Sequence, residues 1–305
     1  MTSTPASAPA VATAALPPTG APQDVKRRPS KQNRTNPLFW VVLALMTLIV
    51  IVPLLYMLLT SLKTVEESRS DPPTFFPAEP SLRAYEVLFF ADKDSPVLLW
   101  LANSLISATA HAVLVLIVCS LAGYALARME FPFERAIFGL IIATLFLPGF
   151  IFMMPNFEIL NRLQWLDTIW AIVVPGAAGA FGVFFMRQFF SSFPISLEES
   201  ARIDGAGPWR VFFSIVLPNA RAALVTLTVL SFLSNWNDFL WPIYALFSPN
   251  RLVLPVGLTQ LQGAYSIDYQ VIMAGAAVAA IPVLILYTFV QRYVIEGVAS
   301  SGIKG

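Results

Sequence analysis

The side chains that most often carry out chemistry are scarce in this chain of 305 residues. It has one histidine, His111, and one cysteine, Cys119, which excludes a zinc site built from several histidines and a disulfide within the chain. Cys119 lies in an apolar run, where a free cysteine is more often a small packed side chain than a reactive thiol. The sequence also lacks the motifs H-E-x-x-H and G-x-S-x-G. These absences argue against an enzyme.

Polar residues at helical spacing offer a different kind of chemistry, hydrogen bonding along a route through apolar segments. One set lies in the apolar run 98–127: Asn103, Ser104, Ser107 and His111. A second set lies in the run 220–247: Thr228, Ser231, Asn235 and Asp238. When these residues are placed around an α-helix, each set lies within a sector of roughly 80–100° of the helix circumference and so forms one stripe. Because polar groups inside a membrane usually face a bundle interior or a water-filled cavity, we expect the two stripes to line a path.

Simpler roles stay open for the same residues. Ser and Thr often hydrogen-bond to their own helix, and Asn often joins two helices. A single histidine such as His111 more commonly connects helices than contacts a ligand. Asp238 is the strongest single candidate for the path, although a position near the outer interface, where a carboxylate stays hydrated, is the alternative.

The composition predicts the elements that must position these residues. Hydrophobic residues make up 57% of the chain and charged residues 12%, a balance typical of a polytopic membrane protein. A span needs about 20 apolar residues to cross about 30 Å of hydrocarbon. Six stretches qualify: about 37–62, 98–127, 136–158, 168–190, 220–247 and 271–294. The fold class predicted is therefore an all-α membrane protein with six transmembrane helices.

The distribution of charge predicts the orientation of these helices. Most of the 19 Lys and Arg residues fall in segments that are cytoplasmic if both termini lie inside, as expected from the excess of positive charge in cytoplasmic loops. The net charge of +1 is spread out, so we expect no nucleic-acid partner. Residues 1–35, rich in Ala, Pro, Thr and Ser, are predicted to be a disordered cytoplasmic tail, and residues 36–305 one domain with six spans. The external loop at about 63–97 is either a small cap or a solvated connector.

Glycine and proline within the fourth predicted span indicate close packing and a kink. Gly176, Gly179 and Gly182 recur at a spacing of three residues, which would let helix backbones approach closely. Pro175 lies in the same span, where it removes a backbone donor and favours a kink.

The internal loop at about 187–219 has the pattern of two short helices that meet at a glycine. Ser196 and Glu199 match a capping box, so a first helix is expected to begin near Leu197 and to end before a left-handed Gly205. Pro208 suits the first turn of a second helix. That helix would carry an apolar face and stop at Pro218, and the face comprises Trp209, Phe212, Phe213 and Val216. An exposed aromatic face of this kind indicates a partner.

This loop resembles a known one. Glu199-Ser200-Ala201, Gly205, Ile215 and Leu217-Pro218 match in order and spacing the cytoplasmic EAA loop of type I ABC importer permeases, with Ser200 where the motif has alanine. The segment Asn235-Trp236-Asn237-Asp238-Phe239-Leu240-Trp241-Pro242 and the ending Ile303-Lys304-Gly305 are similar to the carbohydrate-uptake branch, in particular the smaller permease of maltose-type systems. The resemblance covers about residues 37–305.

The resemblance implies that the loop is a coupling helix seated in a cleft of a cytoplasmic ATPase subunit. The residues expected to dock there are Glu199, Ser200, Ala201, Arg202, Asp204, Gly205, Ala206, Trp209, Phe212 and Pro218. The chain contains no Gly-Lys dipeptide and hence no phosphate-binding loop, so ATP would be bound by the partner and no cofactor or metal by this chain. The expected assembly adds a sister permease, two ATPase subunits and an extracytoplasmic solute-binding protein, in a bacterial or archaeal cytoplasmic membrane.

In such an importer the polar stripes would meet a sugar. The expected path residues are Asn103, Ser107, His111, Ser231, Asn235, Asp238 and Trp241. Trp241 or Trp236 would stack on a sugar face. If the larger sister permease holds the substrate alone, these residues only shape the pathway. A polyol or a glycerol phosphate is an alternative cargo, and a secondary transporter is the alternative mechanism.

Overall fold

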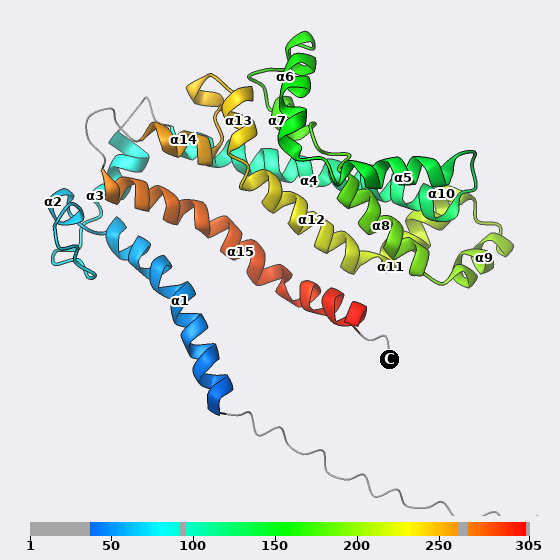
Figure 1. Ribbon diagram of the computed structural model, residues 1–305, viewed down its shortest axis with the longest axis horizontal. Helices are drawn as coiled ribbons and strands as arrows, with labels where there is room; N and C mark the ends of the chain where they lie inside the picture. The colour runs from blue at the N-terminus through cyan, green and yellow to red at the C-terminus, as the bar shows by residue number, and fades with distance from the viewer. Residues whose placement is uncertain (1–36, 92–95, 262–267, 303–305) are drawn as a thin grey trace, which may run out of the picture. The chain divides into compact units, whose positions relative to one another are not determined.

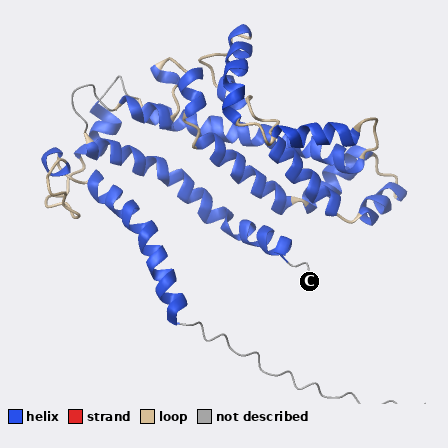
Figure 2. Ribbon diagram, viewed as in Figure 1, coloured by secondary structure: helices blue, strands red, loops and turns tan. Residues whose placement is uncertain are grey.

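The computed structural model describes residues 37–91, 96–261 and 268–302, with the backbone alone for residues 292–302. Every regular element within these ranges is helical, and no strand occurs among them (Figure 2). The predicted N-terminal tail and the ending Ile303-Lys304-Gly305 lie outside the described residues. The chain divides into two units, residues 1–50 and 51–305, and helix α1 (Pro37–Ser61) crosses the boundary between them. At 25 residues α1 is about 37 Å long, enough to span a bilayer.

The segment predicted as an external loop is folded rather than extended. It contains α2 (Val65–Ser68), α3 (Arg83–Glu86) and the π-helix η1 (Val87–Ala91). Lys63 is buried, lies 5.0 Å from the ring centre of Tyr56 and donates to the carbonyl of Thr74. Glu67 accepts hydrogen bonds from the Thr74 hydroxyl and the Ala78 amide, so both charges are compensated within a small cap.

Two long helices organise the unit of residues 51–305 (Figure 1). They are α4 (Val97–Arg128) and α15 (Tyr269–Gly302), and they match the predicted second and sixth spans. α4 packs against α8 (Ala180–Ser192) and α12 (Arg221–Trp236), and α12 also packs against α15. Three short elements follow α12 along the chain: α13 (Leu240–Ala245), η4 (Pro249–Arg251) and α14 (Leu254–Gln260). Of these, α14 packs against α4 and α15, and η4 packs against α4.

The third predicted span is not one straight helix. α5 (Glu134–Thr144) is followed by the 3₁₀ turn η2 (Gly149–Phe152) and α6 (Met153–Arg162), and the chain bends by 102° between them. Pro148 lies at the break, where a proline cannot continue the helical hydrogen bonding. This segment is a broken span or a re-entrant loop.

The fourth and fifth predicted spans are also interrupted. α7 (Trp170–Val173) and α8 are separated by a turn in which Gly176 has a φ of 79°, so the expected glycine stripe is wrong for Gly176 and Gly179, which precede α8. Only Gly182 packs as predicted: a Cβ there would lie 2.6 Å from Sγ of Cys119. α12 ends at Trp236, so the fifth span does not continue to residue 247 as one helix.

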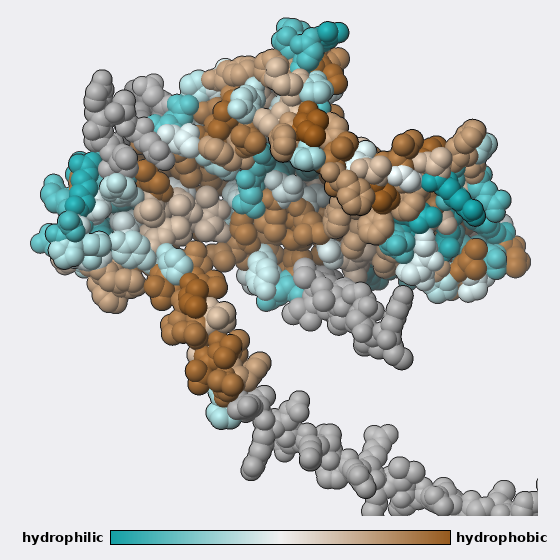
Figure 3. Space-filling view, viewed as in Figure 1, coloured by the Kyte–Doolittle hydropathy of each residue, from teal (hydrophilic) through white to brown (hydrophobic). Residues whose placement is uncertain are grey.

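The count of six spans is therefore not confirmed. Among the described residues, three helices are long and apolar enough to cross a membrane unbroken, and up to five spans result if each bent pair is one span. Hydrophilic residues gather at α2, at α6 and around α9 (Ile195–Ile203), with apolar surface between them (Figure 3).

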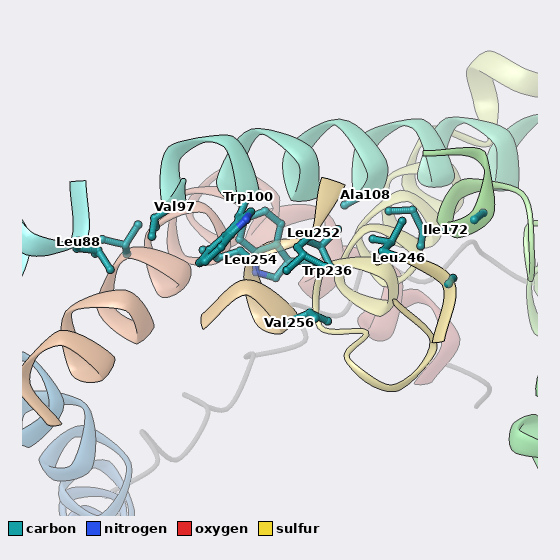
Figure 4. Close-up of a cluster of buried hydrophobic side chains, with 14 of the residues drawn as sticks. Leu88, Val97, Trp100, Ala108, Ile172, Trp236, Leu246, Leu252, Leu254 and Val256 are labelled. Carbon is teal, nitrogen blue, oxygen red and sulfur yellow. The ribbon is translucent and has the colours of Figure 1, made fainter. Parts of the chain in front are cut away.

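Two apolar clusters hold the unit of residues 51–305 together. In the first, Trp100 of α4 lies with Leu254 and Trp236 (Figure 4). A Cβ at Gly257 would lie 2.2 Å from the Trp100 ring, so only glycine lets α14 approach this closely. In the second, Cys119 of α4 is fully buried against α8, which confirms its expected role as a packed side chain.

Candidate functional site

The first helix of the candidate docking loop is α9 (Ile195–Ile203). The predicted capping box is wrong: the N-cap residue is Pro194, no side chain caps the helix, and Ser196 lies inside it. Proline can precede a helix because its extended ψ of 119° directs the chain into the first turn and the first helical amides need no intrahelical partner.

The turn after α9 forms as predicted. Gly205 has a φ of 84°, its amide donates to the carbonyl of Arg202, and the amide of Ala206 donates to the carbonyl of Ala201. These two bonds are the Schellman pattern, which satisfies carbonyls at a helix end and needs a left-handed residue, usually glycine. Pro208 then occupies the first turn of α10 (Pro208–Val211).

The second helix of the loop differs from the predicted one. α10, the π-helix η3 (Phe212–Val216) and α11 (Leu217–Asn219) follow without a break, so Pro218 does not end the helix. The four expected apolar residues do not share one face. Phe212 and Val216 are buried, whereas Trp209 and Phe213 are exposed and stack with ring centres 6.0 Å apart. Half of the predicted docking face is therefore core.

The exposed side of α9 carries most of the expected motif residues. Glu199, Ser200, Arg202, Asp204 and Gly205 are exposed, while Ala201 is buried. Large apolar side chains stand beside them: Leu197, Ile203 and Trp209. Of the remaining expected docking residues, Pro218 is exposed and Ala206 half-buried.

Sequence reasoning missed the residue that anchors α9. The Glu198 side chain is buried and accepts from Nε of Arg128 at 2.8 Å and from the Tyr124 hydroxyl at 3.0 Å. Arg128 also donates to the carbonyl of Phe193, and Arg202 lies 3.8 Å from Glu198. The available signal was Arg128, a positive charge at the end of an apolar span, because a buried cation is costly unless it is paired with a carboxylate.

An aromatic cluster supports this buried ion pair. The ring of Tyr124 lies 4.9 Å from Phe212 and 5.7 Å from Phe190, centre to centre. This cluster joins α4, α8 and η3. Phe212 also contacts Phe213, which stacks on the exposed Trp209. The loop is thus fixed to α4 by one ion pair, two further hydrogen bonds and one aromatic contact.

A second polar cluster surrounds the end of the short helix α7. Three side chains from other elements donate to its consecutive carbonyls: Trp241 Nε1 to Ala171, Asn235 Nδ2 to Ile172, and His111 Nδ1 to Val173, each at 2.8 Å. The His111 assignment implies the tautomer with the proton on Nδ1.

Pro175 explains why these carbonyls need partners. It has no amide hydrogen, so it cannot bond to the Ala171 carbonyl four residues before it, and the turn at Gly176 ends the helical pattern. Carbonyls freed inside a membrane must be satisfied by neighbouring helices or water. Three of the expected path residues perform this task.

Of the other expected path residues, two donate hydrogen bonds within the chain, one is buried, and one lies off the predicted stripe. Asn103 donates to the carbonyls of Asn250 and Leu252, and Ser107 donates to Ser104 of its own helix. Ser231 is buried on α12. Asp238 lies beyond the end of α12 and accepts from the Trp241 amide, so it does not continue the helical stripe.

The chain matches a known protein family over residues 119–299, which include α8, α9 and α12. The family is described as the binding-protein-dependent transport system inner membrane component. This range includes Arg128 and Glu198. It also includes Asn235 and Trp241, two of the three side chains that donate to the α7 carbonyls, whereas His111 precedes it.

Individual relatives match nearly the whole chain. The arabinooligosaccharides transport system permease protein AraQ of Halalkalibacterium halodurans is 32% identical over 90% of this chain and 100% of its own. The diacetylchitobiose uptake system permease protein NgcG of Streptomyces coelicolor is 34% identical over 90% of each chain. A chain in the crystal structure of a bacterial ABC transporter that imports the acidic polysaccharide alginate superimposes with a TM-score of 0.75 and 27% identity, covering 85% of this chain and 98% of that one.

These matches agree with the EAA-type loop and confirm the resemblance to the carbohydrate-uptake branch of type I ABC importer permeases. Members of this group are non-catalytic, multi-pass membrane components of transporters. The chain belongs to the family of binding-protein-dependent transport system inner membrane components, as a permease subunit of an ABC transporter.

Proposed function

We propose that this chain forms half of the membrane pathway of an ATP-driven importer of mono- or oligosaccharides. Relatives named for arabinooligosaccharides, lactose and diacetylchitobiose support a sugar as cargo. A relative named for sulfoquinovosyl glycerol supports glycosylated glycerols as a second class of cargo. The partners are a sister permease, an extracytoplasmic solute-binding protein and two ATPase subunits, which bind the ATP, in the bacterial inner membrane.

The observation that carries the coupling role is the exposed aromatic pair on α10. Trp209 and Phe213 stack on each other and leave 66% and 55% of their surfaces exposed. An aromatic pair on a polar surface loop is the kind of anchor that fills a pocket in a partner. α9, which packs against α10, carries exposed docking residues inferred from the motif, and among them Glu199 and Arg202 offer charged contacts to the ATPase.

The loop is built to transmit movement. The segment from α10 to α11 leads directly into α12, with a 78° bend between them. A displacement of α10 would therefore move α12, which packs on α4 and α15. The buried Glu198 to Arg128 pair gives a second connection, from α9 to the end of α4. Closure of the ATPase subunits would therefore act on two helices of the bundle together.

The first test is affinity purification of the tagged chain from its native membrane in mild detergent. We expect an ATPase, a second permease and a solute-binding protein to co-purify. Recovery of the chain alone, under detergents that preserve such complexes, would favour a secondary transporter.

A second test separates docking from insertion. We expect Gly205→Asp and Trp209→Ala to insert normally but to lose ATPase stimulation by the loaded binding protein. Phe90→Ala, which removes an exposed aromatic side chain at η1, away from the docking loop, is the control and should behave as wild type. Normal stimulated ATP hydrolysis in Gly205→Asp and Trp209→Ala would count against the coupling role.

A further inference from the structure

A hollow of about 380 Å³ lies where α4, α7 and η4 meet. Its volume falls within the range of about 300–1,000 Å³ that is usual for small-molecule sites. The polar and aromatic residues that line it are Asn103, Thr168, Trp170, Asn250 and Arg251. These residues come from three separate regions of the chain, so the fold and not the local sequence creates the hollow.

The hollow lies at the end of α4 opposite the docking loop. Asn103 and Arg128, which pairs with Glu198, are both on α4. Their separation along the helix is about 38 Å at the helical rise per residue, more than the roughly 30 Å of a hydrocarbon core. If the docking loop faces the cytoplasm, the hollow faces the external side.

The walls of the hollow are held rigidly. The Asp167 carboxylate accepts from the amides of Phe247 and Ser248 at 2.9 and 3.0 Å, and from the Ser248 hydroxyl. Arg251 Nη1 donates to the Asp167 carbonyl at 2.8 Å. Because these bonds join the loop before α7 to the loop that contains η4, the lining residues are positioned before any ligand arrives.

Unused hydrogen-bonding capacity is available at the lining. Asn103 donates its two amide hydrogens to the carbonyls of Asn250 and Leu252. Its own side-chain carbonyl has no partner among the described residues. Arg251 uses one of its five N–H donors on a described residue. The hollow therefore presents one amide acceptor and several donors, a combination that suits hydroxyl groups.

An aromatic face and the local charge narrow the ligand class further. Trp170 leaves 54% of its surface exposed, and an indole face can pack against the C–H face of a sugar ring. The carboxylate of Asp167 lies near Arg251 and offsets part of its positive charge. A neutral ligand is thus favoured over an anion.

From these observations we propose that the hollow is an external receiving site for one neutral sugar ring, which stacks on Trp170 and hydrogen-bonds to Asn103 and Arg251. The proposal rests on the proposed sugar-importer function and adds a binding site on this subunit itself. It places first contact between cargo and permease at the external mouth rather than at the α7 carbonyl cluster.

The test is saturation-transfer difference NMR on the detergent-purified complex without its binding protein, with lactose, arabinotriose and diacetylchitobiose as probes. We expect saturation of the ring protons of at least one sugar by the wild-type complex. Trp170→Ala should weaken binding by about tenfold, as for an aromatic anchor at an interface, and Trp170→Phe should retain most of it. Phe90→Ala should match wild type.

The outcomes separate this site from the proposed function. Equal signals from wild type and Trp170→Ala would overturn the site, as would no signal from a complex that still imports one of the three sugars in cells. A stronger signal from glucuronate than from the neutral probes would overturn the assignment to neutral sugars. A wild-type complex that neither binds nor imports any of the sugars would remove the sugar-importer function and the site with it.

Discussion

The docking loop and the α7 cluster use polar residues in opposite ways. In the docking loop, most residues of the motif are exposed and available to a partner, while the neighbouring Glu198 is buried and holds the loop in place. In the α7 cluster, His111, Asn235 and Trp241 donate inward to carbonyls that a broken helix has freed. The comparison teaches that a polar side chain in a membrane protein should first be checked as a hydrogen-bond partner for unsatisfied backbone groups. Only a side chain without such a role is then a candidate for binding substrate.

Removing the anchor of the docking loop should have the largest effect. Glu198→Ala leaves Arg128 buried without its carboxylate, a change that costs about 3–5 kcal/mol when a buried pair loses one partner. We expect a lower unfolding midpoint of the purified complex and loss of stimulated ATP hydrolysis. Glu199→Ala, one residue away and exposed, is the control and should leave the midpoint unchanged. Equal destabilisation by both substitutions would mean that Glu198 is not the anchor.

The turn of the docking loop allows a test with two glycines. Gly205 has a φ of 84°, where a residue with a Cβ costs about 1–2 kcal/mol, so Gly205→Ala should destabilise the loop and reduce stimulated ATP hydrolysis. Gly207, two residues on, has a φ of −70° and open space around its Cβ position, so Gly207→Ala should have little effect. Thermal unfolding and ATPase assays on both variants check this difference, and identical behaviour of the two would contradict it.

The α7 cluster should tolerate substitution better. Asn235→Leu removes one hydrogen bond to the Ile172 carbonyl, and such bonds between membrane helices contribute about 0.6–2 kcal/mol. We expect a lower unfolding midpoint with unchanged half-saturation for sugar uptake. Asn237→Leu is the matched control, because Asn237 is exposed and bonds only to its own helix at Leu233. If Asn235→Leu changed the half-saturation for sugar uptake and left stability unchanged, Asn235 would belong to the transport path.

The smallest expected effect is on the pH dependence of stability, and it concerns Asp167 in the loops beside the external hollow. Partial burial raises the pKa of Asp167, but hydrogen bonds from Ser248 and Phe247 and the charge of Arg251 outweigh it and hold the pKa below its ordinary value. A depressed carboxyl pKa stabilises the fold above the unfolded-state value of about 4 and ceases to do so as the pH falls through the folded-state value. The wild type should therefore exceed Asp167→Asn in unfolding midpoint at neutral pH, and the difference should shrink below about pH 4. A difference that does not depend on pH would contradict this reading.

Part of the molecule could be predicted from local signals. The long helices α1, α4 and α15 follow from uninterrupted apolar length, and the turn at Gly205 and Pro208 follows from the backbone limits of glycine and proline. The EAA-type spacing was also sufficient to indicate the family, because it is a pattern of residues along one loop. None of these inferences requires knowledge of which elements pack together.

The remaining features depend on contacts between distant segments. Glu198 and Glu199 are adjacent and chemically identical, and only the packing of α9 on α4 decides that one is buried and the other exposed. The breaks within the third, fourth and fifth spans interrupt stretches that are long enough to be taken for single helices. The carbonyls freed at the end of α7, in the fourth span, are satisfied by side chains about 60–70 residues away in sequence. The sequence by itself thus determined the class, the unbroken spans and the docking turn. The tertiary structure alone decided the anchor, the broken helices and the external hollow, because burial and hydrogen-bond partners are properties of elements brought together from separate parts of the chain.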